Sequence, residues 1–476
     1  MLNEECSARA SDATGRRILF LDDHDLAAQT GLSRVLHAAS KHPANPVLAP
    51  EKPWEQEHTY VSSVLRDAST GRYRLWYCVL HEGGGSDPSA RLPCYAESDD
   101  GVHWLRPSLG LVEYQGSKDN SILWQRHAED LLACVVVHPS PPSDEYRYLG
   151  YAYDYGRSPA YLDKDGTLLA HSPDGIHWAD DRDLNPVIWS WADVVYFLWD
   201  PLKRRFFGTV KNYLSLRGPT TGDAFLRRVF GFTESTDGIH WTQPLITLLP
   251  DEVDDAWADR HQGQFTQFYG MPVAVYEGVY IGFLQVFRMT GPAAANNDGY
   301  VHLELCTSRD GYHWTRVGDR TPILVRGAAG EFDHGGVYST SAFLTMGDNL
   351  WLYYNGQPRQ HAIGGPTRGG IAVWRRDGLV SLHADGDGEF VTVPLWTAGE
   401  TLHVNANVAG SLAVEVLDEH GRIIPGYELA RCTPVTGDTT DTRVCWGERS
   451  RLALVHRPIS LRVRLSHGDI YSLWVA

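Results

Sequence analysis

The chain has 476 residues and a formal net charge of −17, with 46 glycines and 16 tryptophans against only 4 methionines. It contains no basic cluster to neutralise phosphates, so nucleic acid is excluded as the expected partner. No apolar run is long enough to cross a bilayer and no apolar secretory segment follows Met1, so we expect a cytoplasmic protein that does not bind membranes. Seven scattered cysteines fit reduced core thiols better than a disulfide framework or a metal site.

The first predicted element is a short apolar strand at residues 17–21, followed by Asp22 and Asp23 and then a polar lead-in rich in proline. We expect this strand to pair with the last sheet of the chain and thereby to close a ring of sheets. Asp23, at the end of the strand, is a candidate substrate-binding residue.

The pattern Ser-x-Asp-Gly-x-His-Trp then organises the chain. It occurs at residues 98–104, 172–178, 235–241 and 308–314, and a weaker fifth copy keeps only Asp377-Gly378. Asp-Gly readily takes positive φ in a hairpin turn and the serine can bond the turn amides, so each copy predicts a turn between antiparallel strands. Successive aspartates lie 63 to 74 residues apart, which fits one four-stranded sheet per repeat. The repeated histidines fall on separate sheets, so we expect no shared metal site.

Each repeat is predicted to hold four strands, the third of which ends in the Ser-x-Asp-Gly turn. The predicted ranges are 60–66, 72–80, 92–97 and 103–106; 131–138, 146–154, 167–171 and 177–179; 193–199, 205–211, 228–234 and 240–243; 265–276, 279–287, 302–307 and 313–317; and 336–345, 350–354, 370–374 and 379–383. Five such sheets arranged radially make an all-β, five-bladed β-propeller, predicted for residues 1–385. Residues 386–476 leave the repeat, and their short strands predict a C-terminal β-sandwich that packs against the propeller or a second copy of the chain.

Polar residues at or just before the first strand of each blade are expected to meet at one mouth of the central channel. The candidate catalytic acids there are Glu55, Glu57, Asp193 and Asp333; the candidate substrate-binding residues, besides Asp23, are Trp54, Asp119, Asn120, Trp191, Asp259, His261, Gln262 and His334. Paired carboxylates beside aromatic and amide groups are what glycoside hydrolysis requires. The expected partner is therefore an oligosaccharide or glycoside, and no metal or other cofactor is implied.

The candidate acids can be assigned roles from their neighbours. Asp193 lies between Trp191 and Tyr196, and apolar cover favours a protonated carboxyl, which suits a proton donor. Glu55 or Glu57, on a more open loop, would stay ionised and act as nucleophile or base.

The predicted propeller followed by a sandwich resembles the invertase and levanase family of glycoside hydrolases, family 32. It also resembles the five-bladed relatives of that family, the arabinanases and xylosidases of family 43. In the first blade, the resemblance covers residues 63–67 and the following residues 71–77. The resemblance implies hydrolysis of a furanoside, such as a fructoside or arabinofuranoside. The family's nucleophile position falls near Tyr60, with Glu55 and Glu57 just upstream. Asp130 is nearest to the second-blade acid, and Trp191-Ala192-Asp193 is closest to the motif that carries the acid/base.

Two other readings remain open. A glycoside phosphorylase resembling the mannoside phosphorylases would need a cationic phosphate pocket, to which Lys118, Arg260 and His261 could contribute. A propeller that binds carbohydrate without catalysis would leave the same acids as structural groups.

Overall fold

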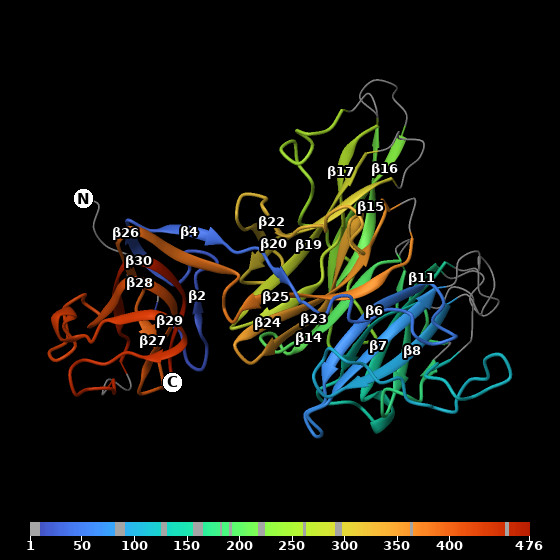
Figure 1. Ribbon diagram of the computed structural model, residues 1–476, viewed down its shortest axis with the longest axis horizontal. Helices are drawn as coiled ribbons and strands as arrows, with labels where there is room; N and C mark the ends of the chain where they lie inside the picture. Colours follow the sequence, from blue (N-terminus) through green and yellow to red (C-terminus); the bar gives the residue numbers. More distant parts are fainter. Residues whose placement is uncertain are drawn as a thin grey trace.

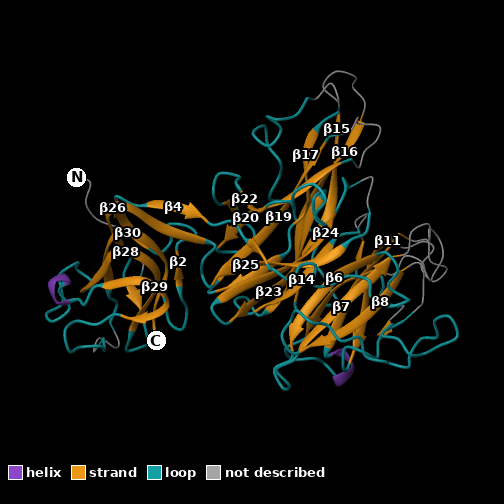
Figure 2. Ribbon diagram, in the orientation of Figure 1, coloured by secondary structure: helices purple, strands orange, loops and turns teal. Residues whose placement is uncertain are grey.

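The protein is nearly all β, as predicted, and Figure 2 of the computed structural model shows strands with very little helix. The structure describes residues 10–80, 91–124, 131–155, 165–180, 183–189, 193–217, 224–259, 263–290, 298–361, 365–452 and 457–476. The chain forms a larger body and a smaller one, and the smaller one holds strands from both ends of the chain (Figure 1). Within these described ranges, no helix is long and apolar enough to cross a membrane.

Within the described ranges, the larger body contains four sheets, which we divide into five consecutive units of mainly antiparallel strands. The fourth and fifth units belong to one sheet and are joined by a single parallel pair, Val301 with Gly336. The first contains β6 (His58–Arg66), β7 (Tyr73–Leu80) and β8 (Arg91–Ser98); the second β9 (Leu131–Val137), β10 (Tyr148–Tyr155), β11 (Asp165–Ser172), β12 (Ala179–Asp180) and β13 (Ile188–Trp189); the third β14 (Val195–Asp200), β15 (Arg205–Arg217) and β16 (Ala224–Ser235). The fourth contains β17 (Phe265–Gly270), β18 (Val273–Tyr276), β19 (Val279–Met289), β20 (Gly299–Ser308), β21 (Thr315–Arg316) and β22 (Pro322–Leu324); the fifth β23 (Gly336–Met346), β24 (Asn349–Gln357) and β25 (Arg368–Arg375). The first three strands predicted for each repeat are confirmed in order, with shifted ends.

The fifth unit takes its edge strand from the N-terminal part of the chain. β5 (Ser40–Lys41) pairs with β25 through Lys41 and Ala372. The prediction of a fourth strand at residues 379–383 was wrong, because β26 (Val380–Thr392) leaves the unit and joins the C-terminal sheet. β5 is polar and only two residues long, so no alternation in the sequence marks it as a strand.

The smaller body is built around one sheet whose main order is β29 (Val435–Arg443), β28 (Leu402–Leu417), β30 (Ser460–Val475), β26 and β3 (Leu26–Thr30). β2 (Ile18–Leu19) pairs with β30, β4 (Ser33–Leu36) pairs with β26, and β1 (Ser11–Asp12) pairs with β27 (Leu395–Trp396). The strand predicted at 17–21 was expected to close the ring of sheets, and this was wrong, because β2 pairs with β30 in a sheet outside the repeat. Phe20, Leu395 and Val404 share one buried core, so strands from both ends of the chain fold together here.

The long strands of this sheet were predicted as separate short ones. β28 and β30 have 16 residues each. Register shifts between Val408 and Ser411 let β28 continue past an irregular segment. Sequence periodicity is interrupted at such a bulge, which is why one strand reads as two.

The repeated turns have the predicted geometry. In the second copy, Gly175 has a φ of +77° and its amide donates to the Ser172 hydroxyl (2.8 Å). The Asp174 carboxylate accepts from the amides of Ile176 and His177, and its second oxygen contacts His177 Nδ1 at 2.7 Å. The other three full copies repeat these contacts, so each histidine is engaged by the aspartate of its own turn.

These turns also hold neighbouring units together. The indole N–H of Trp76 in the first unit donates to the Gly175 carbonyl of the second (2.7 Å), and Tyr151 of the second donates to Gly238 of the third (2.8 Å). Tyr353 of the fifth unit donates to Gly101 of the first (2.7 Å). The Asp-Gly turns therefore contact the preceding unit, and the first unit contacts the last.

The turn aspartates make stability sensitive to acid. Partial burial opposes ionisation, but hydrogen bonds from the histidine, the two amides and the serine outweigh it and lower the pKa of Asp174 and of Asp237 to about 2. Because the folded pKa lies below the unfolded value of about 4, this stabilisation is present above pH 4 and is lost as the pH falls towards 2. The unfolding free energy of the wild-type protein should fall between pH 4 and pH 2. We expect this fall to be smaller by about 1 kcal/mol in Asp174→Asn, after allowing for solvent screening. Urea unfolding at a series of pH values measures this, and an unchanged acid dependence would contradict it.

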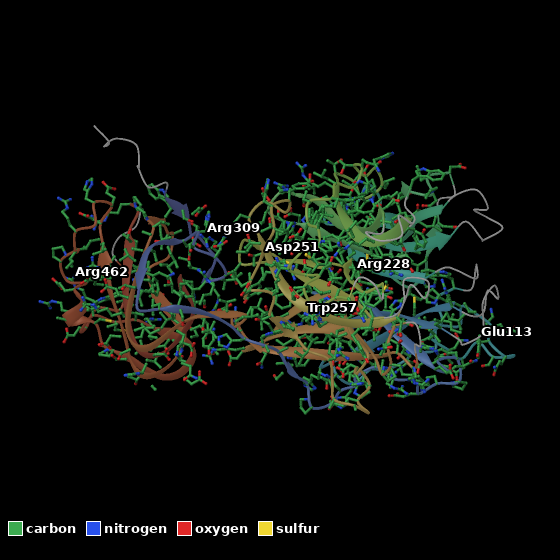
Figure 3. All side chains as sticks on the ribbon, turned by 90° about the horizontal axis from the view of Figure 1, so that it is seen from above. Glu113, Arg228, Asp251, Trp257, Arg309 and Arg462 are labelled. Carbon is green, nitrogen blue, oxygen red and sulfur yellow. The ribbon has the colours of Figure 1, made fainter. Side chains whose placement is uncertain are left out.

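The fifth, weaker copy of the turn lies at the junction of the two bodies. Asp377 has a φ of +59° and forms a buried ion pair with Arg17 (2.8 Å), and it accepts hydrogen bonds from Tyr276 and Ser472. Figure 3 shows Arg309 where the bodies meet, and its guanidinium bonds Asp22 at 2.7 and 2.9 Å. The fifth copy therefore bonds residues of the smaller body, Arg17 and Ser472.

Candidate functional site

The first strands of the five units border one cavity of about 350 Å³. β6 contacts β9, β9 contacts β14, β14 contacts β18 and β23, and β23 contacts β6. The cavity is lined by Tyr60, Val61, Ser62, Leu80, Arg91, Leu132, Ala133, Tyr153, Asp193, Val194, Val195, Tyr196, Tyr269, Tyr338, Ser339, Thr340, Asn355, Gln357 and His361. The expectation that polar residues at or just before the first strands meet in one pocket holds, within the described residues, for Asp193 alone.

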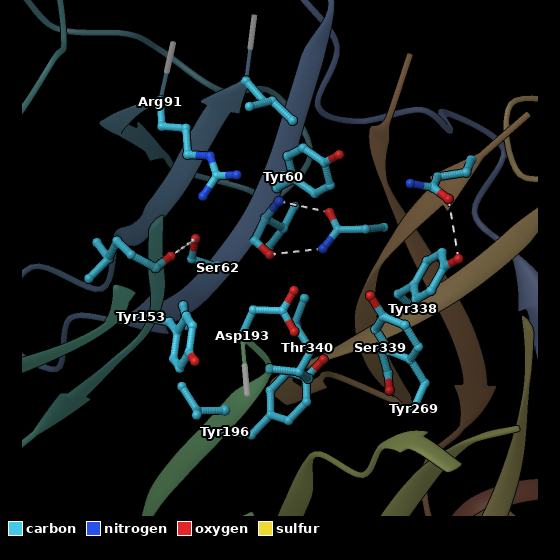
Figure 4. Close-up of a pocket in the computed structure, with 18 of the residues that line it drawn as sticks. Tyr60, Ser62, Arg91, Tyr153, Asp193, Tyr196, Tyr269, Tyr338, Ser339 and Thr340 are labelled. Carbon is cyan, nitrogen blue, oxygen red and sulfur yellow. Dashed lines mark hydrogen bonds between the residues drawn. The ribbon is translucent and has the colours of Figure 1, made fainter. Parts of the chain in front are cut away.

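Asp193 projects into the middle of this cavity (Figure 4). It lies two residues before β14, and its side chain is 35% exposed. The ammonium group of Lys211, on the adjacent strand β15, bonds its carboxylate directly and is itself only 3% exposed. A buried ammonium needs an opposite charge, and that charge in turn stabilises the ionised carboxylate. The ion pair therefore opposes the role of proton donor that the sequence suggested for Asp193.

Tyrosine side chains form much of the wall. Burial raises the pKa of Tyr60, and burial together with the charge of Asp193 raises that of Tyr269 well above its ordinary value. Their hydroxyls are consequently protonated at neutral pH and available as donors. His361 Nε2 lies 3.0 Å from the Tyr269 hydroxyl, and Lys211 Nζ lies 5.0 Å from the centre of the Tyr269 ring. Tyr269 thus links the imidazole to the ion pair.

Amide side chains hold the walls in place. Asn355 accepts from the Val61 amide (2.8 Å) and donates to the Val61 carbonyl (3.0 Å), which ties β24 to β6. Gln285 is fully buried and donates to the Tyr196 hydroxyl (2.9 Å) and to the Ser339 carbonyl (3.0 Å). Such contacts between units keep the cavity side chains in fixed positions.

Glu55, a predicted nucleophile, is not among the residues that line the cavity. It is fully buried, and its carboxylate accepts from Arg106 (3.0 Å), from the Tyr77 hydroxyl (2.6 Å) and from the Glu51 and Lys52 amides. Both oxygens are therefore occupied by the surrounding loop, which is the arrangement of a structural carboxylate.

Asp333 is likewise buried away from the cavity lining. It forms an ion pair with Lys41 (2.7 Å) and accepts from the Tyr354 hydroxyl (2.8 Å). Since Lys41 belongs to β5, Asp333 helps to hold the strand that completes the fifth unit.

The remaining predicted residues are dispersed. Glu57 is half exposed beside His58, Asp23 pairs with Arg34, and Trp54 is buried in the core of the first unit. Asp119 and Lys118 are exposed, Asn120 bonds backbone groups of its own loop, Asp259 is exposed, and His334 bonds the Gly327 carbonyl. Trp191, His261 and Gln262, with Asp130 and Arg260, lie outside the described residues. Of the predicted residues that the structure describes, only Asp193 lines the cavity.

Sequence reasoning named Tyr196 beside Asp193 but missed the other tyrosines, Arg91, Lys211 and His361. It searched the loops before the first strands, whereas most lining side chains lie on the strands themselves. A tyrosine in an apolar strand, such as Tyr269 in β17, looks like an ordinary core residue. Tyr269 is the fifth residue of β17 and Tyr338 the third residue of β23, so no shared position marked them in the sequence.

No family model matches the chain. It is 25% identical over 300 residues to A type blood N-acetyl-α-D-galactosamine deacetylase of Flavonifractor plautii, an alignment covering 54% of this chain and 34% of that protein. The chain thus spans about a third of the length of this curated relative. Similar solved structures include an N-acetylgalactosamine deacetylase from F. plautii in complex with blood group B trisaccharide (TM-score 0.46, 19% identity, 74% of this chain and 97% of that one) and a glycosyl hydrolase from Bacteroides ovatus (TM-score 0.46, 13% identity, 72% and 94%). These similar proteins are carbohydrate-active enzymes.

Proposed function

We propose that this protein is a glycoside hydrolase whose substrate binds in the cavity at the meeting point of the five first strands. The observation that carries the proposal is Asp193, a carboxylate inside that cavity, ion-paired with the buried Lys211. A fixed, charged carboxylate among tyrosine hydroxyls and amides is suited to a reaction that develops positive charge on a sugar ring.

We also propose that the larger body is a five-bladed β-propeller and the smaller one a β-sandwich. The cyclic contacts from β6 through β9, β14, β18 and β23 back to β6, and the bond from Tyr353 to Gly101, support the ring. The division proposed from the sequence at residue 385 needs two changes. β26 begins at Val380 and pairs with β30, and residues 18–36 pair with β26 and β30, so both segments are grouped with the C-terminal sheet.

In this proposal Asp193 acts as an ionised group, either as nucleophile or as the base that activates water. Within the described lining residues, Asp193 is the only carboxylate. Tyr269, whose hydroxyl contacts His361, lies beside the ion pair, and its raised pKa suits it to donate a hydrogen bond to the leaving oxygen rather than to give up its proton. The furanoside preference rests on the resemblance of the sequence to families 32 and 43.

A sugar deacetylase is the second candidate, favoured by the alignment with the F. plautii enzyme. Hydrolysis of an N-acetyl amide also needs an activated water and donors for the developing oxyanion. Asp193 and the tyrosine hydroxyls could supply both.

A substrate panel separates these functions. Aryl furanosides, aryl pyranosides and N-acetylated hexosamines are incubated with the protein, with and without inorganic phosphate, beside an Asp193→Asn variant as the inactive reference. We expect release of the aryl group from at least one furanoside, independent of phosphate and absent in the variant. Release of acetate with the glycosidic bond intact would replace glycoside hydrolysis by deacetylation, and turnover only with phosphate would indicate a phosphorylase.

A further inference from the structure

We propose that the rim of the cavity contains a subsite for an oxyanion, formed by Arg288 and Arg326 around Tyr300, so that the substrate is an acidic carbohydrate. The inference rests on the proposed function and names its substrate class. The anionic group could be the carboxylate of a uronic acid, a sulfate ester or a phosphate ester, all of which a guanidinium binds through paired N–H donors.

The two arginines flank one aromatic ring. Arg288 on β19 is the direct cross-strand partner of Tyr300 on β20. The guanidinium carbon of Arg326 lies 3.9 Å from the centre of the Tyr300 ring, and Arg326 Nη1 donates to the His334 carbonyl (2.6 Å). The guanidinium carbon of Arg288 lies 5.8 Å from the Trp257 ring, which is labelled in Figure 3. Two cations are thus positioned beside flat rings that can support a sugar face.

The pair carries positive charge with little compensation. Within the described ranges, neither Arg288 nor Arg326 has an ion pair with a carboxylate. Arg288 is the cross-strand partner of Tyr300 and Arg326 lies over the Tyr300 ring, so the two positive charges repel. The pKa of Arg326 is lowered mainly by burial; Tyr300 raises it and Arg288 lowers it further. Asp298 lies two residues from Tyr300 and is bonded to Gln360 instead. With the Gln360 amide oriented so that its nitrogen faces acceptors and its oxygen faces a donor, the nitrogen donates to the two Asp298 carboxylate oxygens (2.6 and 2.8 Å). An anion bound between the arginines would relieve this repulsion.

Another pair of arginines, Arg74 and Arg147, also lies beside one tyrosine ring, that of Tyr148. The Arg74 guanidinium, however, donates to the Tyr95 and Tyr148 hydroxyls and to the Asp174 carbonyl. Within the described residues, the Arg288 guanidinium has no hydrogen-bond partner of this kind, so we expect a ligand to supply the acceptor there.

A backbone hydrogen bond connects the subsite to a residue that lines the cavity. The His361 amide donates to the carbonyl of Gly299 (3.0 Å), the residue before Tyr300, while the His361 ring contacts the Tyr269 hydroxyl inside the cavity (3.0 Å). Lys211 and Arg228 lie on the other side of Tyr269, at 5.0 and 5.8 Å from its ring. A substrate whose reacting sugar lies beside Asp193 could therefore place the next sugar, or an acidic substituent, against Arg288.

Calorimetric titration tests the subsite without relying on turnover. The probes are an oligogalacturonate, a sulfated oligosaccharide, a sugar phosphate, a neutral oligosaccharide of the same length and inorganic phosphate, each titrated into wild-type protein and the Asp193→Asn variant. We expect at least one acidic saccharide to bind more tightly than the neutral one, and Arg288→Ala and Arg326→Ala each to weaken that binding about 10- to 100-fold. Arg431→Ala, at an exposed position of the smaller body, is the matched control and should leave it unchanged.

The arms separate the possible results. Tighter binding of one acidic saccharide than of the others identifies the anionic group. If the Asp193→Asn variant keeps this preference, the subsite is supported even where the hydrolytic role of Asp193 fails. Arg288 is exposed, so its variant tests the site even if Arg326→Ala disturbs the loop at His334. Equal affinity for acidic and neutral saccharides, binding of inorganic phosphate alone, or an Arg288→Ala variant that binds like wild type would overturn the proposal.

Discussion

Asp193→Asn is expected to lower kcat on glycosides by at least about a thousandfold, with equal losses for good and poor leaving groups. The reason is the ion pair with Lys211, which holds Asp193 ionised and therefore suits it to attack or to activate water, steps that every substrate requires. A proton donor would behave differently, because aryl glycosides with good leaving groups need little protonation and would be spared. Steady-state rates on a series of aryl glycosides measure the difference.

Folding has to be controlled in this experiment, because the substitution weakens the partner of a buried ammonium. The double variant Asp193→Asn/Lys211→Met removes both charges and should restore stability but not activity. Asp259→Asn, on an exposed loop away from the cavity lining, is the matched single substitution and should retain wild-type rates. If Asp193→Asn is folded and retains activity on both leaving-group classes, Asp193 has no part in the chemistry.

Glu55→Gln is expected to destabilise the protein by about 3 to 5 kcal/mol, because it leaves the buried guanidinium of Arg106 without its closest counter-charge. Arg106 has 2% of its side chain exposed, and its other carboxylate partner, Glu51, is largely exposed at 3.2 Å. The same substitution also weakens the contacts to Tyr77 and to the amides of residues 51 and 52. Denaturant unfolding of the purified variants measures the free energy change.

Glu57→Gln provides the comparison, since this carboxylate is only two residues away and half exposed. It should change the unfolding free energy by less than about 0.5 kcal/mol. Activity per folded molecule should remain close to wild type in both variants. A Glu55→Gln protein of normal stability whose kcat collapses would contradict the structural role and return Glu55 to the list of catalytic groups.

The sequence by itself determined the elements whose causes are local. The Ser-x-Asp-Gly turns could be placed because the hydrogen bonds of Asp174 and Ser172 are made within seven residues. The first three strands of each repeat could be placed because alternation and apolar runs are read along the chain. The start of β14 also identified Asp193, since a polar residue before an inner strand is a local feature.

The tertiary structure alone decided which side chains contact one another. Asp193 and Lys211 are 18 residues apart, and only the register of β14 against β15 brings them together. Glu55 and Arg106 are separated by 51 residues, and nothing in either local sequence distinguishes a buried ion-paired carboxylate from a catalytic one. The same holds for β5, which completes the fifth unit across more than 300 residues of chain. Hydrogen bonds and ion pairs between distant strands depend on register and packing, and these are properties of the whole fold.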